Sequence, residues 1–510
     1  MGMATGYAKA SGKLPAVMLH TTVGSLHGAM ALRGALHEQI PMVVLAGESI
    51  DFGESEGPDP GKQWLRHLAD IGGPVRLIKN CVKWSVGMSS STLIPATIQR
   101  ACQLAMSSPR GPVFVGLPME FLFHKMSTDA LASTNFPPPP TPAPRGLEEL
   151  ADLLEKAENP LIITEAAGEN ITSVQRLVEL AELLGATVVE TRSCSYVNFP
   201  RSHPLHGGFQ PSELLQEADL ILLLATVAPW HPPSVKLNPG AKVVVLDENP
   251  LRQELPFWGF PVDLVLTGEV ESSLELLMDH LKERIPPDDP PRVARVKCWQ
   301  QRHQKRKQIW TKEALAFKEE KPMDTRWVVY KLNEMLPPDS IIVEETITHR
   351  LAIHRYLDRL QPGCFFSGFT GGLGTGLGTA LGVKIARPDR PLIALIGDGA
   401  FNYNPVMAAL GFAQEYEIPI LIVLFNNQGY LTMKEELPRY FPEGWAMKTG
   451  TFVGTSITPS PNYAAIAGAF DGYGEKVEDP GELGPALERG LAALSRGQVA
   501  LLDIWLKPVN

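Results

Sequence analysis

Two short polar segments contain residue types that could hold a phosphate through a divalent metal ion. Gly397-Asp398-Gly399 follows an apolar run at 392–396, and a segment with Asn427 and Gly429 follows an apolar run at 420–425. Glycines allow a tight turn and let a phosphate approach the backbone closely. A carboxylate and an amide oxygen suit Mg²⁺, which leaves part of its coordination to water and phosphate. The two segments therefore predict a cation that bridges the protein to a bound diphosphate.

The elements around these segments decide whether the two can meet. Both apolar runs have the length of a buried strand, and an amphipathic stretch at 405–416 predicts the helix that connects them. A right-handed crossover would place the two strands side by side, with their carboxyl ends together. We expect the N-terminal end of the 405–416 helix to offer free amides to the anion.

The same alternation of apolar and amphipathic stretches recurs along the chain. Amphipathic stretches such as 172–184 separate most of the apolar runs. Strands that alternate with helices predict an α/β fold of mainly parallel sheets, with ligands beyond the carboxyl ends of the strands. The other runs expected to form strands are 16–19, 42–46, 113–117, 161–164, 220–224, 243–246, 340–343 and 500–504.

The composition excludes several classes of function. The 510 residues are 44% hydrophobic and 20% charged, and the net charge of −10 argues against nucleic acid as the main partner. Five well-separated cysteines favour a reducing compartment over disulfides or a zinc site. No apolar run approaches the ~18 residues of a membrane span. We therefore expect a soluble, cytoplasmic enzyme.

Two linkers divide the chain. Successive prolines at 136–144 exclude helix and predict an extended segment. The stretch 286–322 begins with prolines and aspartates and continues as a basic run with Trp299, Arg306 and Trp310. We interpret this run as a solvated linker helix rather than an RNA contact. The remaining segments predict three doubly wound domains, at 1–125, 146–285 and 323–510.

The two polar segments also carry a resemblance to a known family. GDG, 26 residues and then NN is similar to the signature of thiamine diphosphate enzymes, the group of acetolactate synthases and pyruvate decarboxylases. The resemblance implies thiamine diphosphate and Mg²⁺ as cofactors, and pyrimidine-binding, middle and diphosphate-binding domains in that order. It implies Asp398, Asn427 and the Gly429 carbonyl as metal ligands. The residues against the diphosphate would include Gly397, Gly399 and Ala400.

Two further stretches resemble parts of that family's cofactor pocket. In the glycine-rich run 371–378, Leu373 would be the hydrophobic wedge and the Gly371 carbonyl would accept from the aminopyrimidine. The loop 343–348 would place Ile347 and Thr348 against the cofactor. The glycines at 376 and 378 have a second interpretation, the close packing of a helix on a strand. The run contains no GxGxxG, which disfavours a nicotinamide site.

The first segment resembles the pyrimidine-binding domain in its stretches 2–13, 20–25 and 41–47. The family's activating glutamate would lie nine residues before Gly6, ahead of Met1, so we expect this domain to be incomplete at its N-terminus. Loss of such an acid/base group typically costs about 10²–10⁴ in rate. Glu38, before Pro41, is expected on the surface instead. The resemblance implies a homodimer or homotetramer.

Two histidines indicate which family member the chain resembles. His20 and His231 lie in stretches similar to those that carry active-site histidines in benzoylformate decarboxylase, and imidazole suits proton transfer near neutral pH. The resemblance implies non-oxidative decarboxylation of a 2-keto acid to an aldehyde and CO₂. The alternatives are an acetolactate synthase-type carboligase and a cofactor-binding protein with little turnover. Residues 431–460, with Trp445, Met447 and Phe452, are expected to shape the substrate pocket.

Overall fold

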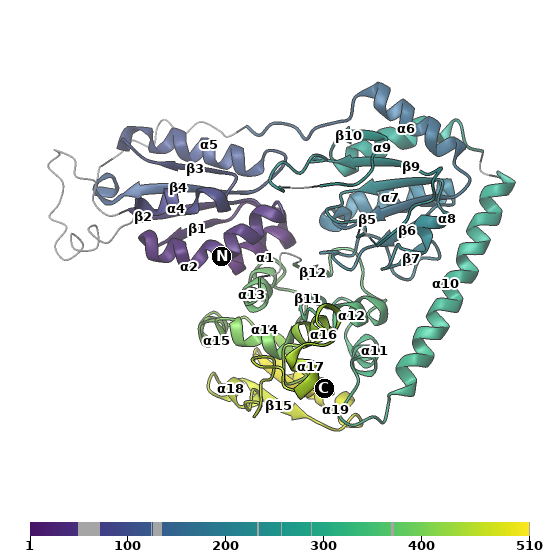
Figure 1. Cartoon of the computed structure of the whole chain (residues 1–510). Helices are drawn as coiled ribbons and strands as arrows, with labels where there is room; N and C mark the ends of the chain where they lie inside the picture. Colours follow the sequence, from purple (N-terminus) through teal and green to yellow (C-terminus); the bar gives the residue numbers. More distant parts are fainter. Residues whose placement is uncertain are drawn as a thin grey trace. The chain divides into compact units, whose positions relative to one another are not determined.

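The computed structural model describes residues 1–48, 72–123, 125, 135–231, 234–256, 258–286, 288–368 and 372–508. The chain forms two compact units, Met1–Pro139 with Thr370–Ala386, and Pro140–Phe369 with Arg387–Asn510. Each described sheet is parallel and is covered by helices, which confirms the predicted α/β fold (Figure 1). None of the described helices has the length and apolarity required to cross a bilayer.

The first unit is built on a four-stranded sheet of order β1-β2-β4-β3. Val43 and Val44 are consecutive in β2 but belong to different clusters, one with α5 and one with α2 and α4, so both faces of the sheet are buried. The strands are β1 (Ala16–Leu19), β2 (Met42–Glu48), β3 (Trp84–Gly87) and β4 (Pro112–Pro118). The helices are α1 (Gly2–Ser11), α2 (Thr21–His37), α4 (Gly73–Ile78), α5 (Ile94–Met106) and α13 (Gly376–Ala386), with short 3₁₀ turns at Lys79–Cys81, Ser91–Leu93 and Met119–Phe123.

Helices α1 and α13 approach each other through glycines. A Cβ added to Gly6 would lie 2.1 Å from the Thr379 carbonyl oxygen, and one added to Gly382 would lie 2.0 Å from the Met3 carbonyl oxygen. Real side chains do not fit such distances, so glycine is required at both positions. Gly378 lies in the same contact, where an added Cβ would lie 3.1 Å from the Gly2 Cα. The close packing that the sequence predicts for Gly378 is therefore against a helix and not against a strand.

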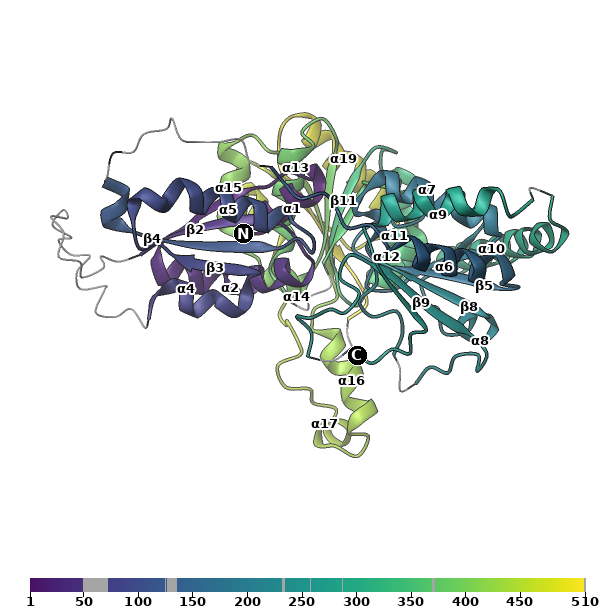
Figure 2. The same cartoon turned by 90° about the horizontal axis from the view of Figure 1, so that it is seen from above.

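The second unit contains two six-stranded sheets. The first has the order β10-β9-β8-β5-β6-β7, and helices α6, α7 and α9 bury one of its faces (Figure 2). Its strands are β5 (Pro160–Thr164), β6 (Thr187–Glu190), β7 (His206–Gly208), β8 (Leu220–Leu224), β9 (Lys242–Asp247) and β10 (Leu264–Thr267). The helices are α6 (Pro144–Lys156), α7 (Ile171–Leu184), α8 (Leu214–Glu217) and α9 (Val270–Lys282), with a 3₁₀ turn at Ala167–Glu169.

The second of these sheets has the order β12-β11-β13-β14-β16-β15, and α11, α12 and α19 bury one of its faces. Its strands are β11 (Ile341–Glu345), β12 (Phe365–Ser367), β13 (Leu392–Gly397), β14 (Leu421–Asn426), β15 (Tyr473–Val477) and β16 (Ala500–Trp505). The helices are α11 (Thr325–Met335), α12 (Arg350–Tyr356), α14 (Asp398–Tyr403), α15 (Val406–Glu415), α16 (Leu431–Tyr440), α17 (Trp445–Thr449), α18 (Ala464–Gly468) and α19 (Leu483–Ser495).

The linkers form largely as predicted. Residues 135–143 contain neither helix nor strand, and α6 begins at Pro144, where a proline fits the first helical turn. The basic run forms one long helix, α10 (Pro290–Ala316), which runs along the second unit (Figure 1). It is not solvated all round, because Trp299 is buried and Trp310 and Arg306 are half-buried. The limits of the three predicted domains stay a prediction.

Candidate functional site

The predicted meeting of the two polar segments occurs at the carboxyl edge of β13 and β14. These strands are parallel neighbours with Gly397 paired to Phe425, so Asp398 and Asn427 follow at the same edge. The Gly429 amide donates to the Asp398 Oδ2 at 3.1 Å and to the Asn427 Oδ1 at 3.3 Å. A carboxylate oxygen and an amide oxygen therefore converge on one point, as the spacing of the segments predicts.

Asp398 is a buried carboxylate without a charge partner among the described residues. Its side chain is 2% exposed, and the groups that donate to it are backbone amides, with Gly399 N at 2.8 Å from its Oδ1. Burial raises the pKa of Asp398 to about 7, although the amides of Gly399 and Gly429 oppose this effect. Buried charges are normally paired or bound to metals, so this carboxylate fits a cation ligand.

Two residues at this edge have strained backbones. Gln428 has a φ of 60° and Ile347 has a φ of 52°, a conformation that is unusual for any residue except glycine and rare for a β-branched one. The segment around Gln428 is fixed by hydrogen bonds from Tyr430 N to Thr455 O (2.7 Å) and from Ile457 N to Gln428 O (2.8 Å). Such strain persists only where the surroundings impose it, and it concentrates at functional sites.

The loop that carries Ile347 and Thr348 is held by a buried ion pair. The Arg350 guanidinium donates to the Glu344 carboxylate at 2.8 Å, and the Ser367 hydroxyl donates to the same carboxylate at 2.7 Å. Both Ile347 and Thr348 are half-buried. These contacts place the loop after β11 beside the edge that carries Gly397 and Asp398, because β11 and β13 are neighbouring strands.

His349 was missed by the sequence reasoning, which stopped one residue earlier. Its ring lies between the Thr325 hydroxyl, 2.8 Å from Nδ1, and the Asn427 amide nitrogen, 3.3 Å from Nε2. Burial lowers the pKa of His349 to about 4, so the ring is neutral at pH 7. A neutral ring that donates to Thr325 can accept from the Asn427 amide, which leaves the amide oxygen of Asn427 directed to the site. The sequence feature that could have identified His349 is its position directly after the predicted loop 343–348.

The helix that begins at the site is not the one predicted. We expected the helix at 405–416 to present its N-terminus, but α14 begins at Asp398 and α15 begins eight residues later, at Val406. Gly397 is the N-cap of α14, with an extended backbone, so the chain turns into helix directly after the strand. Gly399 is required in that first turn, because a Cβ there would lie 2.7 Å from the Tyr430 ring. Ala400 follows in the same turn and is buried.

The other predicted residues belong to other elements of the chain or fall outside the described residues. His231 is exposed in the second unit, where its Nδ1 lies 2.7 Å from the Ser234 hydroxyl. In the first unit, His20 is the exposed N-cap of α2 and Leu373 is half-buried. Gly371 lies outside the described residues.

The structure also describes Glu38 and two of the residues expected to shape the substrate pocket. Glu38 is not a surface residue, because its side chain is 9% exposed and forms an ion pair with the buried Lys9. Trp445 is 62% exposed and Met447 is 40% exposed on α17, so neither belongs to the core of the second unit. Their role in a substrate pocket stays a prediction.

Comparison with known proteins agrees with this geometry. Three family models match the chain: the N-terminal TPP binding domain of thiamine pyrophosphate enzymes at residues 1–60, their central domain at 147–277 and their C-terminal TPP binding domain at 347–504. A benzoylformate decarboxylase from Pseudomonas aeruginosa is 28% identical over 97% of this chain and 88% of its own length. A probable acetolactate synthase from Mycobacterium bovis is 27% identical over 99% of this chain and 86% of its own length.

Solved structures show the same fold. The thiamine diphosphate-dependent 4-hydroxybenzoylformate decarboxylase of Rhodococcus jostii superposes with a TM-score of 0.79 at 24% identity, over 99% of this chain and 90% of that one. The converging oxygens at the β13–β14 edge and the three matched models lead to one conclusion. The chain belongs to the thiamine diphosphate-dependent enzymes, in the family that contains decarboxylases and acetolactate synthases.

Proposed function

We propose that the protein decarboxylates a 2-keto acid non-oxidatively to an aldehyde and CO₂, with thiamine diphosphate and Mg²⁺ as cofactors. The observation that carries the proposal is the convergence of the Asp398 and Asn427 oxygens on the Gly429 amide beside the strained Gln428. The similarity to benzoylformate decarboxylase along almost the whole chain supports this reaction. The three sheets support the predicted domains at 1–125, 146–285 and 323–510.

The residues present fit the cofactors. Asp398, Asn427 and the Gly429 carbonyl would hold Mg²⁺, since hard cations prefer such oxygen ligands. When bound, thiamine diphosphate supplies the carbon nucleophile and the electron sink for loss of CO₂. Leu373 and the Gly371 carbonyl would position its aminopyrimidine. The groups against its diphosphate would be Gly397, Gly399, Ala400, Ile347 and Thr348.

His20 and His231 are the proposed proton-transfer residues. Both are exposed, and both follow a strand, β1 and β8 respectively, on the carboxyl side where α/β sheets bind ligands. Replacing either by alanine should lower kcat by about 10²–10⁴. The matched control is His280→Ala, on α9, which should leave kcat unchanged. Wild-type kcat in both His20→Ala and His231→Ala would refute these roles.

The reaction is tested by incubating the chain, with thiamine diphosphate and Mg²⁺, with benzoylformate and with pyruvate. We expect benzaldehyde and CO₂ from benzoylformate, and the Asp398→Ala variant should form neither product. Acetolactate as the main product would overturn the decarboxylase assignment. It would favour the second candidate, a carboligase, which the similarity to a probable acetolactate synthase supports.

We also propose that the chain self-associates as a homodimer or homotetramer. Val23, Leu26 and Met30 follow one another at helical spacing on α2 and are 64%, 50% and 46% exposed. An exposed apolar stripe of this kind supports a protein interface. Leu26→Glu should therefore shift the mass measured by light scattering toward the monomer. A monomeric wild-type chain would contradict this proposal.

A further inference from the structure

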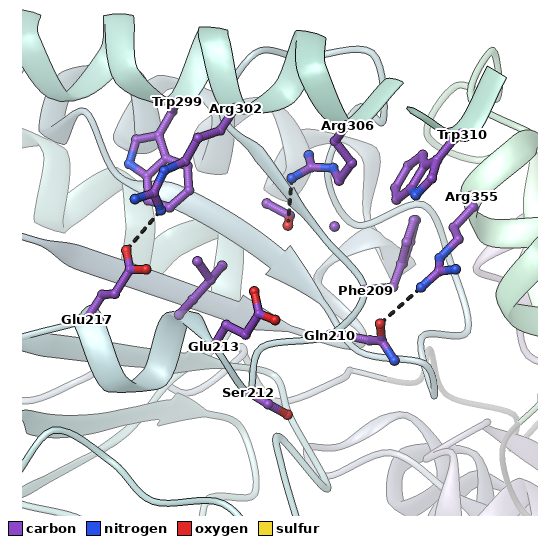
Figure 3. Close-up of a pocket in the computed structure, with 13 residues that line it drawn as sticks. Phe209, Gln210, Ser212, Glu213, Glu217, Trp299, Arg302, Arg306, Trp310 and Arg355 are labelled. Carbon is purple, nitrogen blue, oxygen red and sulfur yellow. Dashed lines mark hydrogen bonds and ion pairs between the residues drawn. The ribbon is translucent and has the colours of Figure 1, made fainter. Parts of the chain in front are cut away.

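The second unit contains a cavity that does not involve the β13–β14 edge. Its volume is about 600 Å³, within the range of small-molecule sites. One wall is a stripe of α10, with Trp299, Arg302, Arg306 and Trp310 at spacings of three, four and four residues, and the opposite wall is the segment 207–217 (Figure 3). Arg355 of α12 completes the lining.

The two ends of this cavity differ in their charge balance. At one end Arg302 is neutralised by Glu217, 2.8 Å away, and its guanidinium lies over the Trp299 ring. At the other end Arg306 and Arg355 form no ion pair with a described carboxylate. Arg306 donates to the carbonyls of His206 and Gly207, and Arg355 donates to the Gln210 amide oxygen at 3.0 Å.

The uncompensated charge is partly removed from water. Burial lowers the pKa of Arg306 to about 10, and its Nε is buried without a hydrogen-bond acceptor in the described residues. Three arginines and two glutamates line the cavity, so it carries a net charge of +1, with Glu213 exposed near its centre. A desolvated guanidinium without a carboxylate is costly, and an anionic ligand would offset that cost.

The cationic end is also aromatic. The Arg306 and Arg355 guanidinium carbons lie 5.4 Å and 5.6 Å from the centroid of the Trp310 ring, and Phe209 lines the same end. Phe209 is fixed from behind by a stacked contact with the His354 ring, at 4.9 Å between centroids. A flat ring and an acidic group on the same ligand would match both features.

We propose that this cavity binds a small aromatic anion, with its carboxylate or phosphate group against Arg306 and Arg355 and its ring against Trp310. Ser212 and Glu213 would accept hydrogen bonds from hydroxyl or amino substituents on the ring. The site does not depend on the proposed decarboxylation, because none of the predicted cofactor or proton-transfer residues lines it.

The test uses the full chain saturated with thiamine diphosphate and Mg²⁺, with phenyl phosphate and benzoate as probes. Calorimetric titration should show saturable binding of at least one probe. Binding of phenyl phosphate would indicate a phosphate ligand, and binding of benzoate would indicate a carboxylate ligand. Arg355→Gln and Trp310→Leu should each weaken binding about tenfold, the effect of losing one charge-assisted hydrogen bond or one stacked ring. The matched control is Lys305→Gln, an exposed cation of α10 outside the cavity, which should bind like the wild type.

Several results would overturn the proposal. The proposal fails if neither probe reaches saturation. It also fails if both Arg355→Gln and Trp310→Leu retain wild-type affinity while circular dichroism shows them folded. If inorganic phosphate or cyclohexanecarboxylate binds with the same affinity as the aromatic probes, the cavity does not recognise an aromatic ring. Binding should persist in Asp398→Ala, which separates this cavity from the β13–β14 edge; loss of binding there would place the probe at that edge instead.

Discussion

Metal binding at Asp398 should depend steeply on pH. Because burial raises the pKa of this carboxyl to about 7, most of the metal-free protein carries it protonated at pH 6 and ionised at pH 8. A proton and a metal ion compete for the same oxygens. With a pKa of about 7, only about one molecule in eleven is ready to bind at pH 6, so the apparent affinity should be about tenfold weaker there than at pH 8.

The same pKa fixes the direction of the effect on stability. A carboxyl whose pKa is higher in the folded chain than in the unfolded chain destabilises the fold as the pH rises from about 4 toward 7 and above. The difference between 3.8 and about 7 corresponds to about 4 kcal/mol at full ionisation. A bound cation would remove much of this penalty, so it should stabilise the protein more at pH 8 than at pH 6.

Mn²⁺ is a suitable probe, because it accepts the same oxygen ligands and is detected directly by electron paramagnetic resonance. Titrations without thiamine diphosphate avoid the ionisation of the cofactor's own phosphates. Asp398→Asn should abolish binding at both pH values. Asp503→Asn is the matched control: burial also raises the pKa of this carboxyl, to about 6, but its partner is the Asn426 amide, so binding should persist. Equal affinities at pH 6 and pH 8, or binding by Asp398→Asn, would refute the reasoning.

Three other predictions concern the supports of the site and the first unit. His349→Ala should weaken Mn²⁺ binding about 10–100-fold, the usual effect of removing a group that orients a ligand, and wild-type affinity would contradict its role. Glu344→Gln should cost about 3–5 kcal/mol in urea unfolding, since Arg350 would lose its buried partner. Burial opposes ionisation of Glu344, but Arg350 and the Ser367 hydroxyl outweigh it and keep the pKa below its usual value, so this stability should disappear as the pH falls below about 4. Gly382→Val should prevent the packing of α1 on α13 and lower the melting temperature, whereas Gly468→Val in α18, where a Cβ meets nothing within 4 Å and φ is not positive, should lower it less.

The long apolar strands could be predicted because a strand that is buried on both faces has a continuous run of apolar residues. All ten expected runs form strands, with ends that differ by a few residues at most. Six of the described strands were not predicted, and five of them (β3, β7, β10, β12 and β15) lie at sheet edges. These edge strands have only three to five residues, and β15, with the sequence Tyr-Gly-Glu-Lys-Val, is also partly exposed, so they lack a long continuous apolar run.

The candidate site also has a part that could be predicted from the sequence and a part that could not. The convergence of Asp398 and Asn427 follows from two neighbouring strands and could be predicted from spacing alone. The contacts of His349 could not, because Thr325 comes from α11 and Asn427 from the end of β14. The stripe on α10 appeared in the sequence as a solvated basic run, since only packing against the 207–217 segment reveals which face is covered.

The glycine contact between α1 and α13 has a consequence for biosynthesis. Gly6 meets Thr379, so the first unit contains residues separated by more than 370 positions and is interrupted by most of the second unit. At a translation rate of about 5–20 residues per second, α13 is made roughly 20–70 s after α1. During that interval the face of α1 that carries Gly6 has no helix to pack against, whereas the sheet of strands β5 to β10 can already form. The N-terminal unit is therefore expected to finish folding late on the ribosome, and premature termination before Gly376 should leave a nascent chain that chaperones recognise.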